Sequence, residues 1–124
     1  MKDLTHNKPI SLDQHGLADY AFALASATVP TLIGANKKAI TLYQMIAIQV
    51  FLYGTLSKHK FALKPLISPE THRKIDIINL AGIALLSGYK KIRKDKKALP
   101  FNLALLGIGI ANVLLTDWSG KNSK

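Results

Sequence analysis

Four long stretches that are almost free of charged residues constrain this chain more than any other feature. They cover residues 17–33, 39–56, 77–89 and 98–116, and Asp19 is the only charged residue inside them. An apolar helix of about 20 residues matches the hydrocarbon thickness of a bilayer. Helices of a soluble bundle would instead show a charged face that recurs along each helix. The pattern therefore predicts an all-α protein, an integral membrane four-helix bundle.

The charge of the chain is strongly positive and lies outside these stretches. The sequence has 17 Lys and Arg residues and a formal net charge of +10. Basic residues beside apolar spans are typical of anchoring at anionic phospholipid headgroups, so we expect the lipid bilayer as the partner. No patch of interleaved aromatic and basic residues typical of RNA binding occurs, and we expect no nucleic-acid partner. With no cysteine, the sequence offers neither a disulfide nor a thiolate ligand.

A ten-residue motif occurs twice and opens two of the apolar stretches. Residues 10–19 and 67–76 both read Ile-Ser-x-acid-x-His-x-x-x-Asp, and the two copies start 57 positions apart. Ser11 is expected to cap the first helix, with Gln14 in the capping-box position. In the second copy Ser68 takes the capping role and a proline follows at the first helical position. The two copies predict two helices that start in the same way.

The duplication extends to the hairpin turns. Lys-Lys-Ala at residues 37–39 matches Lys-Lys-Ala at residues 96–98, at an offset of 59. We therefore predict one domain, residues 1–124, with repeat 1 at about 10–57, repeat 2 at about 67–118 and polar tails at both ends. A two-helix unit returns the chain to its starting side, so the hairpins should be parallel repeats related by a pseudo-two-fold axis along the membrane normal. Both copies of the motif then lie at one end of the bundle.

The candidate site is the polar cluster His15, Asp19, His72 and Asp76. In each copy the histidine and the aspartate are four residues apart, on one face of a helix. Three interpretations are open, of which the structural one is preferred: a histidine pairs with an aspartate whose insertion into a membrane costs about 2.5–3.5 kcal/mol. The cluster could instead bind Zn²⁺ or Mn²⁺, for which imidazole and carboxylate are suitable ligands. The third interpretation is proton or ion handling on a permeation path.

Other polar residues inside the apolar stretches are expected to hydrogen-bond between helices. They are Gln44, Gln49, Asn79, Asn102 and Asn112. Small residues along the stretches permit close helix approach within the chain or between copies of it, which is compatible with a homo-oligomer. No nucleophile elbow, His-Glu-x-x-His motif or glycine-rich phosphate loop occurs, so we predict neither an enzyme nor a cofactor.

The pattern His-Gly-x-x-Asp-Tyr at residues 15–20, followed by Val-Pro-Thr-Leu-Ile-Gly at residues 29–34, resembles the bacterial SPW-repeat family. Members are small membrane proteins of duplicated helical hairpins, with Ser-Pro-Trp near the end of a helix. This chain has Val-Pro-Thr there, and Leu-Ser-Gly at residues 86–88 in the second copy. The resemblance implies a duplicated hairpin in the bacterial cytoplasmic membrane. We therefore expect a non-catalytic scaffold or accessory subunit of the membrane; the alternative is a small transporter or a metal- or proton-handling protein that uses the cluster.

Overall fold

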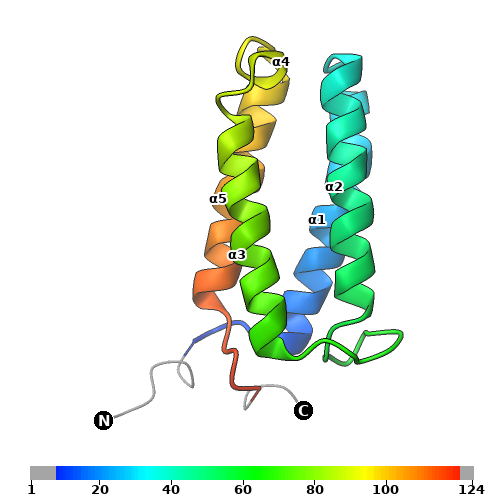
Figure 1. Cartoon of the computed structure of the whole chain (residues 1–124), viewed down its shortest axis with the longest axis vertical. Helices are drawn as coiled ribbons and strands as arrows, with labels where there is room; N and C mark the ends of the chain where they lie inside the picture. Colours follow the sequence, from blue (N-terminus) through cyan, green and yellow to red (C-terminus); the bar gives the residue numbers. More distant parts are fainter. Residues whose placement is uncertain (1–7, 121–124) are drawn as a thin grey trace.

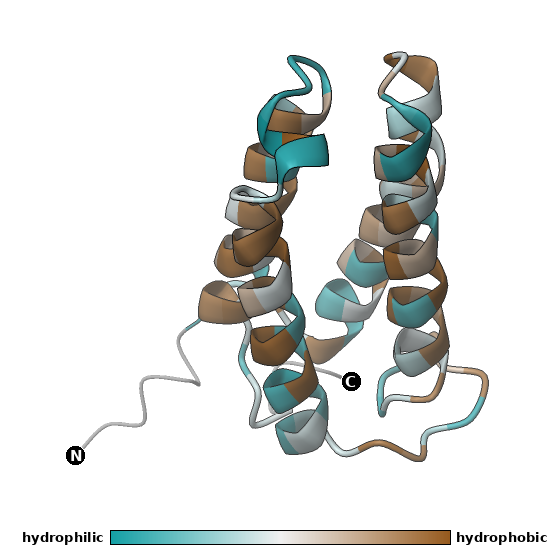
Figure 2. Cartoon of the chain, turned by 45° about the horizontal axis from the view of Figure 1, so that its top comes forward, coloured by the Kyte–Doolittle hydropathy of each residue, from teal (hydrophilic) through white to brown (hydrophobic). Residues whose placement is uncertain are grey.

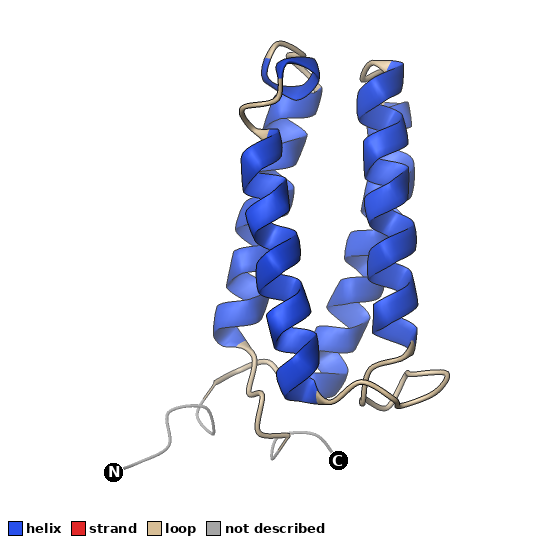
Figure 3. Cartoon of the chain, in the orientation of Figure 1, coloured by secondary structure: helices blue, strands red, loops and turns tan. Residues whose placement is uncertain are grey.

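The computed structural model describes residues 8–120, which form five α-helices and no strand (Figures 1 and 3). The helices are α1 (Leu12–Leu32), α2 (Lys37–Thr55), α3 (Pro69–Leu86), α4 (Lys90–Arg93) and α5 (Ala98–Leu115). The predicted all-α class is confirmed. The predicted polar tails lie largely outside the described residues.

The two predicted helix starts are confirmed in detail. Ser11 Oγ accepts a hydrogen bond from Gln14 N at 3.1 Å, and Gln14 Oε1 accepts one from Ser11 N at 2.9 Å, which completes a capping box. At the start of α3, Ser68 Oγ accepts from Thr71 N at 3.2 Å and a proline occupies the first turn. The same local chemistry therefore fixes where α1 and α3 begin.

The long helices form two hairpins that stand side by side (Figure 1). Helix α1 packs on α2 and α3 packs on α5, while contacts between α1 and α5 join the hairpins. We call the end with both hairpin turns the turn end, and the end with the loop of residues 56–68 the motif end. The sequence did not predict α4, which belongs to the second turn. Its lysine-rich sequence shows no helical periodicity of apolar residues, but the side chain of Ile92 is completely buried in the core.

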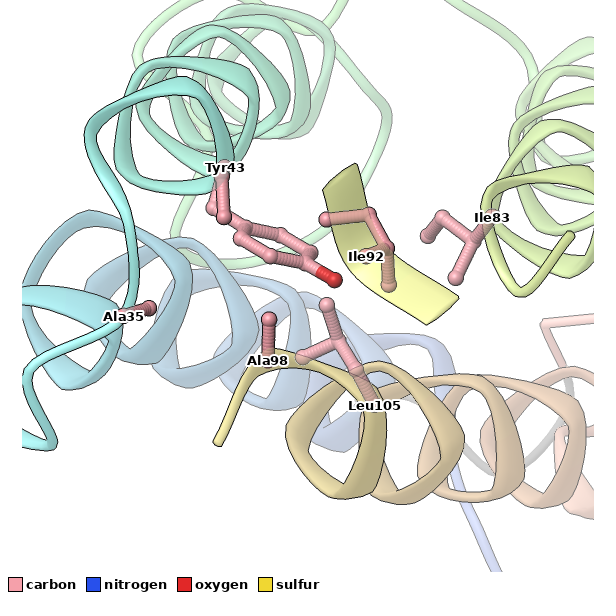
Figure 4. Packing of buried hydrophobic residues seen from close by; sticks show 7 residues of the cluster. Ala35, Tyr43, Ile83, Ile92, Ala98 and Leu105 are labelled. Atoms are coloured by element: carbon pink, nitrogen blue, oxygen red, sulfur yellow. The ribbon is translucent and has the colours of Figure 1, made fainter. Parts of the chain in front are cut away.

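Within residues 8–120, the larger of the two clusters of buried apolar residues lies near the turn end. In Figure 4 the Tyr43 ring of α2 points toward Ile92 and Leu105, and Ile83 lies on the far side of Ile92. The cluster joins α2, α3, α4 and α5. Tyr43 also donates its hydroxyl hydrogen to Asn102 Oδ1 at 2.7 Å, so one polar contact between α2 and α5 is embedded in this core. The turn end is thus held by aromatic and aliphatic packing around the buried hydrogen bonds of Asn102.

A single carboxylate ties the two turns together. Asp95 Oδ2 accepts from the backbone N–H of Asn36 at 2.9 Å, and Asp95 Oδ1 accepts from the backbone N–H groups of Lys97 and Ala98 at 2.8 and 3.0 Å. The Asn36 N–H, followed by those of Ala98 and Lys97, holds the pKa of Asp95 below its usual range because each donor favours the ionised form. The contact links the first turn to the start of α5.

The outer surface of the hairpins is apolar over most of its length. Figure 2 shows hydrophobic residues along most of the helices and hydrophilic residues mainly at the turn end and at the motif end. The side chains of Leu32, Ile78 and Leu85 are 80%, 73% and 79% exposed. Among the helices in residues 8–120, only α5 is both long and apolar enough by composition to cross a membrane, and 28% of its residues are buried. Polar residues in the first turns of α1 and α3 lower the hydropathy of those helices.

Candidate functional site

The predicted polar cluster lies at the motif end, where α1 and α3 bring all four of its residues together. His15 and Asp19 are one turn apart on α1, and His72 and Asp76 are one turn apart on α3. Their side chains are only 3–8% exposed. Four ionisable side chains are therefore buried in one small volume between the hairpins.

The inward atoms of the cluster form a closed ring in which nitrogen and oxygen alternate. His15 Nε2 lies 2.9 Å from Asp76 Oδ2 and 3.3 Å from Asp19 Oδ2. His72 Nε2 lies 2.9 Å from Asp19 Oδ2 and 3.3 Å from Asp76 Oδ2. Each imidazole thus makes its shorter contact with the aspartate of the other helix. The cluster joins the hairpins rather than closing two separate pairs within the helices.

A hydroxyl group holds the outer nitrogen of each imidazole. His15 Nδ1 lies 2.8 Å from Thr116 Oγ1, and the Thr116 hydroxyl donates its own hydrogen to the carbonyl oxygen of Asn112. Ser57 Oγ lies 2.5 Å from His72 Nδ1 in the same way, and its hydrogen goes to the carbonyl oxygen of Tyr53. Since each hydroxyl hydrogen is already used, each oxygen accepts from the imidazole. Both Nδ1 atoms therefore carry a hydrogen.

The outer oxygens of the carboxylates have unequal partners. Asp76 Oδ1 accepts from the Tyr53 hydroxyl at 2.7 Å, whereas Asp19 Oδ1 faces Asn112 Nδ2 at 3.5 Å. A hydrogen bond to an ionised carboxylate is strong at 2.7 Å and weak at 3.5 Å. Asp76 is accordingly the better-held carboxylate of the two.

The partners of the cluster occur in matched sets. Ser57 and Thr116 are 59 positions apart, and so are Tyr53 and Asn112. Isolated bridges pair Ile10 with Thr116 and Ser57 with Ile67, next to the starts of α1 and α3. These contacts cross between the hairpins: Thr116 and Asn112 contact His15 and Asp19, and Ser57 and Tyr53 contact His72 and Asp76. The sequence did not predict the roles of Ser57 and Thr116, although that offset aligns them.

An aromatic residue closes the cluster toward the motif end. The Trp118 ring packs against the rings of His15 and His72, with centroid distances of 4.6 and 5.9 Å. Its indole N–H donates to the carbonyl oxygen of Val113 at 3.0 Å. Trp118 lies beyond the end of α5 and is half-buried against the histidines.

The predicted inter-helix polar contacts are found in part. Asn102 bonds to Tyr43 and to Ile83 O across helices, Asn112 faces Asp19, and Asn79 is half-buried. The prediction is wrong for Gln44 and Gln49, which are exposed and make no hydrogen bond with any other residue in the described part of the chain. The packed face of α2 carries the buried Ala39, Tyr43, Ala47 and Val50. Gln44 lies one position beyond Tyr43 and Gln49 one position before Val50, so both lie off the packed face of α2. Gln49 lines an open surface hollow between α2 and α3 that Asn79 also lines.

The chemistry of the arrangement is that of ion pairing and ligation. Two imidazole nitrogens and two carboxylate oxygens converge, and the four ligand atoms lie within 4.8 Å of one another. Such a set can neutralise charge or bind a cation. Comparisons with protein-family models, with curated proteins and with solved structures found no match. The resemblance to the SPW-repeat family stays a prediction.

Proposed function

We propose that this chain is a small, non-catalytic integral membrane protein of two parallel helical hairpins that serves as a scaffold or accessory subunit. In this proposal the buried His/Asp cluster is the joint between the hairpins. The observation that carries the proposal is an apolar outer surface around a charged interior. Soluble proteins place their ionisable side chains in the opposite way.

The outer surface supports placement in lipid. Large apolar side chains are exposed on α1, α2, α3 and α5, which a soluble monomer of this size would not tolerate over so large an area. They include Leu24, Leu32, Met45, Ile48, Leu52, Ile78, Leu85, Leu103, Ile108 and Leu114. In a bilayer the same surface contacts acyl chains, and the backbone groups are satisfied within the helices.

The joint accounts for the ionisable residues inside the molecule. A carboxylate buried in apolar surroundings is costly unless it is paired. Among the described residues, the salt-bridge partners of Asp19 and Asp76 are the two histidines, and each histidine contacts both aspartates. Separation of the hairpins would leave these groups without their shorter contacts. The cluster therefore favours one association of α1 with α3.

The turn end supports contact with anionic headgroups. Lys90, Lys91, Lys94 and Lys96 line a shallow surface hollow of about 560 Å³ around Asp95 at this end. Flexible ammonium groups at the end of apolar helices bind phosphate groups of lipids, at about 1 kcal/mol for each lysine near the surface. In the proposal the turn end therefore lies at one face of the bilayer.

The geometry favours a joint over a transport pathway. The cavity beside the cluster has a volume of about 30 Å³, lined by residues that include Asp19, Tyr53 and Asp76. A volume of this order holds about one water molecule. A passage for ions would need a continuous wet path past the carboxylates, and the side chains of the cluster are nearly inaccessible.

Fractionation of cells that express the full chain tests the proposal. We expect the protein to stay in the membrane pellet after extraction with alkaline carbonate and to require detergent for release. Recovery in the aqueous fraction without detergent, as a monodisperse helical protein, would overturn the membrane assignment. Replacement of both aspartates by asparagine should lower the yield of assembled protein, whereas Glu70→Gln, an exposed carboxylate outside the cluster, should not.

A further inference from the structure

The four inward atoms of the cluster point to a ligand that the ion-pair description leaves out. We propose that Nε2 of His15 and His72 and Oδ2 of Asp19 and Asp76 bind one divalent transition-metal ion, for which Zn²⁺ fits best. This inference rests on the proposed joint between the hairpins and names what occupies it. The joint alone requires only the ion pairs, and the inference adds a bound metal ion to it.

The spacing of the four atoms is close to that of a tetrahedral site. A tetrahedral ion with bonds of about 2.0–2.1 Å separates its donor atoms by about 3.3 Å. The four nitrogen–oxygen separations around the ring are 2.9, 3.3, 2.9 and 3.3 Å. All four donor atoms lie within 4.8 Å of one another, so the Nε2–Nε2 and Oδ2–Oδ2 pairs would have to draw closer to complete a tetrahedron.

The hydrogen bonds at the outer nitrogens select the ligating form of both histidines. Because Nδ1 of His15 donates to Thr116 and Nδ1 of His72 donates to Ser57, a neutral imidazole carries its only hydrogen on Nδ1. The lone pair of Nε2 then points at the centre of the ring. Metal-bound histidines characteristically donate their other N–H to a fixed acceptor, which sets the orientation of the imidazole. Here both acceptors are themselves fixed by bonds to backbone carbonyls.

Charge balance favours a single dication. Two buried carboxylates need two positive charges, which either two imidazolium rings or one divalent ion can supply. The rings of His15 and His72 have their centroids 5.2 Å apart, so two imidazolium charges would repel each other in a medium of low dielectric constant. One dication between the carboxylates neutralises the same charge without that repulsion.

The donor set indicates which metals to test. Two imidazole nitrogens and two carboxylate oxygens, with no thiolate in the chain, suit Zn²⁺ and Mn²⁺ better than soft Cu(I) or an iron–sulfur cluster. Zn²⁺ binds more tightly than Mn²⁺ to a given nitrogen and oxygen site. The neighbouring cavity of about 30 Å³ leaves room for one water molecule beside the two aspartates.

Metal analysis of the full chain, purified in a mild detergent after zinc reconstitution, tests the inference. We expect about one Zn²⁺ per chain to survive gel filtration, since the four donors complete one tetrahedral site. Glu70→Gln should retain this zinc, and Asp76→Asn should lose it. Ser57→Ala, which removes the acceptor of His72 Nδ1, should weaken binding by about 10–100-fold. Wild-type protein that is helical, monodisperse and metal-free with excess Zn²⁺ or Mn²⁺ would overturn the proposal.

A second measurement on the wild type decides the matter if the ligand variants do not fold. Co²⁺ bound at a four-coordinate nitrogen and oxygen site gives visible absorption bands, and added Zn²⁺ should raise the unfolding temperature while a chelator lowers it. Lack of both responses refutes the metal site. A metal-free protein that stays in the membrane would refute this inference and leave the scaffold proposal standing. Zinc binding by a chain found in the aqueous fraction would support the metal site and refute the membrane scaffold.

Discussion

Replacement of Asp76 by asparagine is the sharpest test of how the two hairpins are held together. Asp76 contacts His15 Nε2 at 2.9 Å, His72 Nε2 at 3.3 Å and the Tyr53 hydroxyl at 2.7 Å. Asparagine keeps the volume and can still accept from Tyr53, but it removes the charge and puts an NH2 donor where Asp76 Oδ2 faces the two Nε2 atoms. Removal of one partner from a buried charge cluster typically costs about 3–5 kcal/mol because the remaining charge is uncompensated.

The expected loss corresponds to a factor of about 10²–10³ or more in the ratio of folded to unfolded protein. It can be measured as the shift of an unfolding transition in mixed micelles, where helicity is followed as the mole fraction of SDS increases. Glu70→Gln is the matched control: Glu70 pairs with Lys74 at 3.6 Å on an exposed face, so its loss should cost less than about 1 kcal/mol.

The unequal partners of the two carboxylates sharpen this test. Asp19→Asn should be milder than Asp76→Asn by about 1 kcal/mol, because at Asp76 the short bond from Tyr53 loses its ionised acceptor, whereas Asp19 Oδ1 has only the 3.5 Å contact with Asn112. If Asp76→Asn is no more destabilising than Glu70→Gln, the cluster does not hold the hairpins. If Asp19→Asn is the more damaging of the two, the assigned hydrogen bonds are wrong.

Two further predictions concern the turn end. Tyr43→Phe should destabilise the protein by about 1–3 kcal/mol in the same assay, because it leaves the buried Asn102 Oδ1 without the Tyr43 donor. An unchanged transition would show that the contact is dispensable. For Asp95, the folded-state pKa is lowered, so its stabilisation is present above the ordinary carboxyl pKa of about 3.9 and is lost as the pH falls through the lower folded value. Thermal unfolding of Asp95→Asn should therefore vary less with pH below about 4 than that of the wild type, and parallel curves would contradict this.

The helix starts could be predicted because their chemistry is local. Ser11 with Gln14, and Ser68 followed by a proline, satisfy free N–H groups within a few residues of the chain. The short α4 could not be predicted in this way. Its only buried residue is Ile92, and what holds that side chain is the packing of Tyr43, Ile83 and Leu105 from distant parts of the sequence. Tertiary packing decides the structure there, and local propensity does not.

The candidate site was predictable in its residues and not in its pairing. Spacing of four residues places each histidine beside the aspartate of its own helix, and the duplication predicts that two such pairs share one end. The sequence contains no signal for the closer contact with the aspartate of the other helix, because that depends on how α1 and α3 approach. The exposed position of Gln44 and Gln49 has the same origin: which face of α2 is packed is decided by α1.

The crossed pairing explains why a duplicated hairpin suits a buried charge cluster. Within one hairpin, His15 reaches only Asp19, at 3.3 Å; the 2.9 Å contact needs Asp76 of the other copy. A single hairpin would therefore leave one histidine and one aspartate in apolar surroundings with only their 3.3 Å contact to each other, which is unfavourable. Two hairpins that carry the same motif supply the missing contacts to each other, as partners do across an isologous interface. The shorter contacts thus make the association of the hairpins, and not the folding of either one, the step that the cluster stabilises.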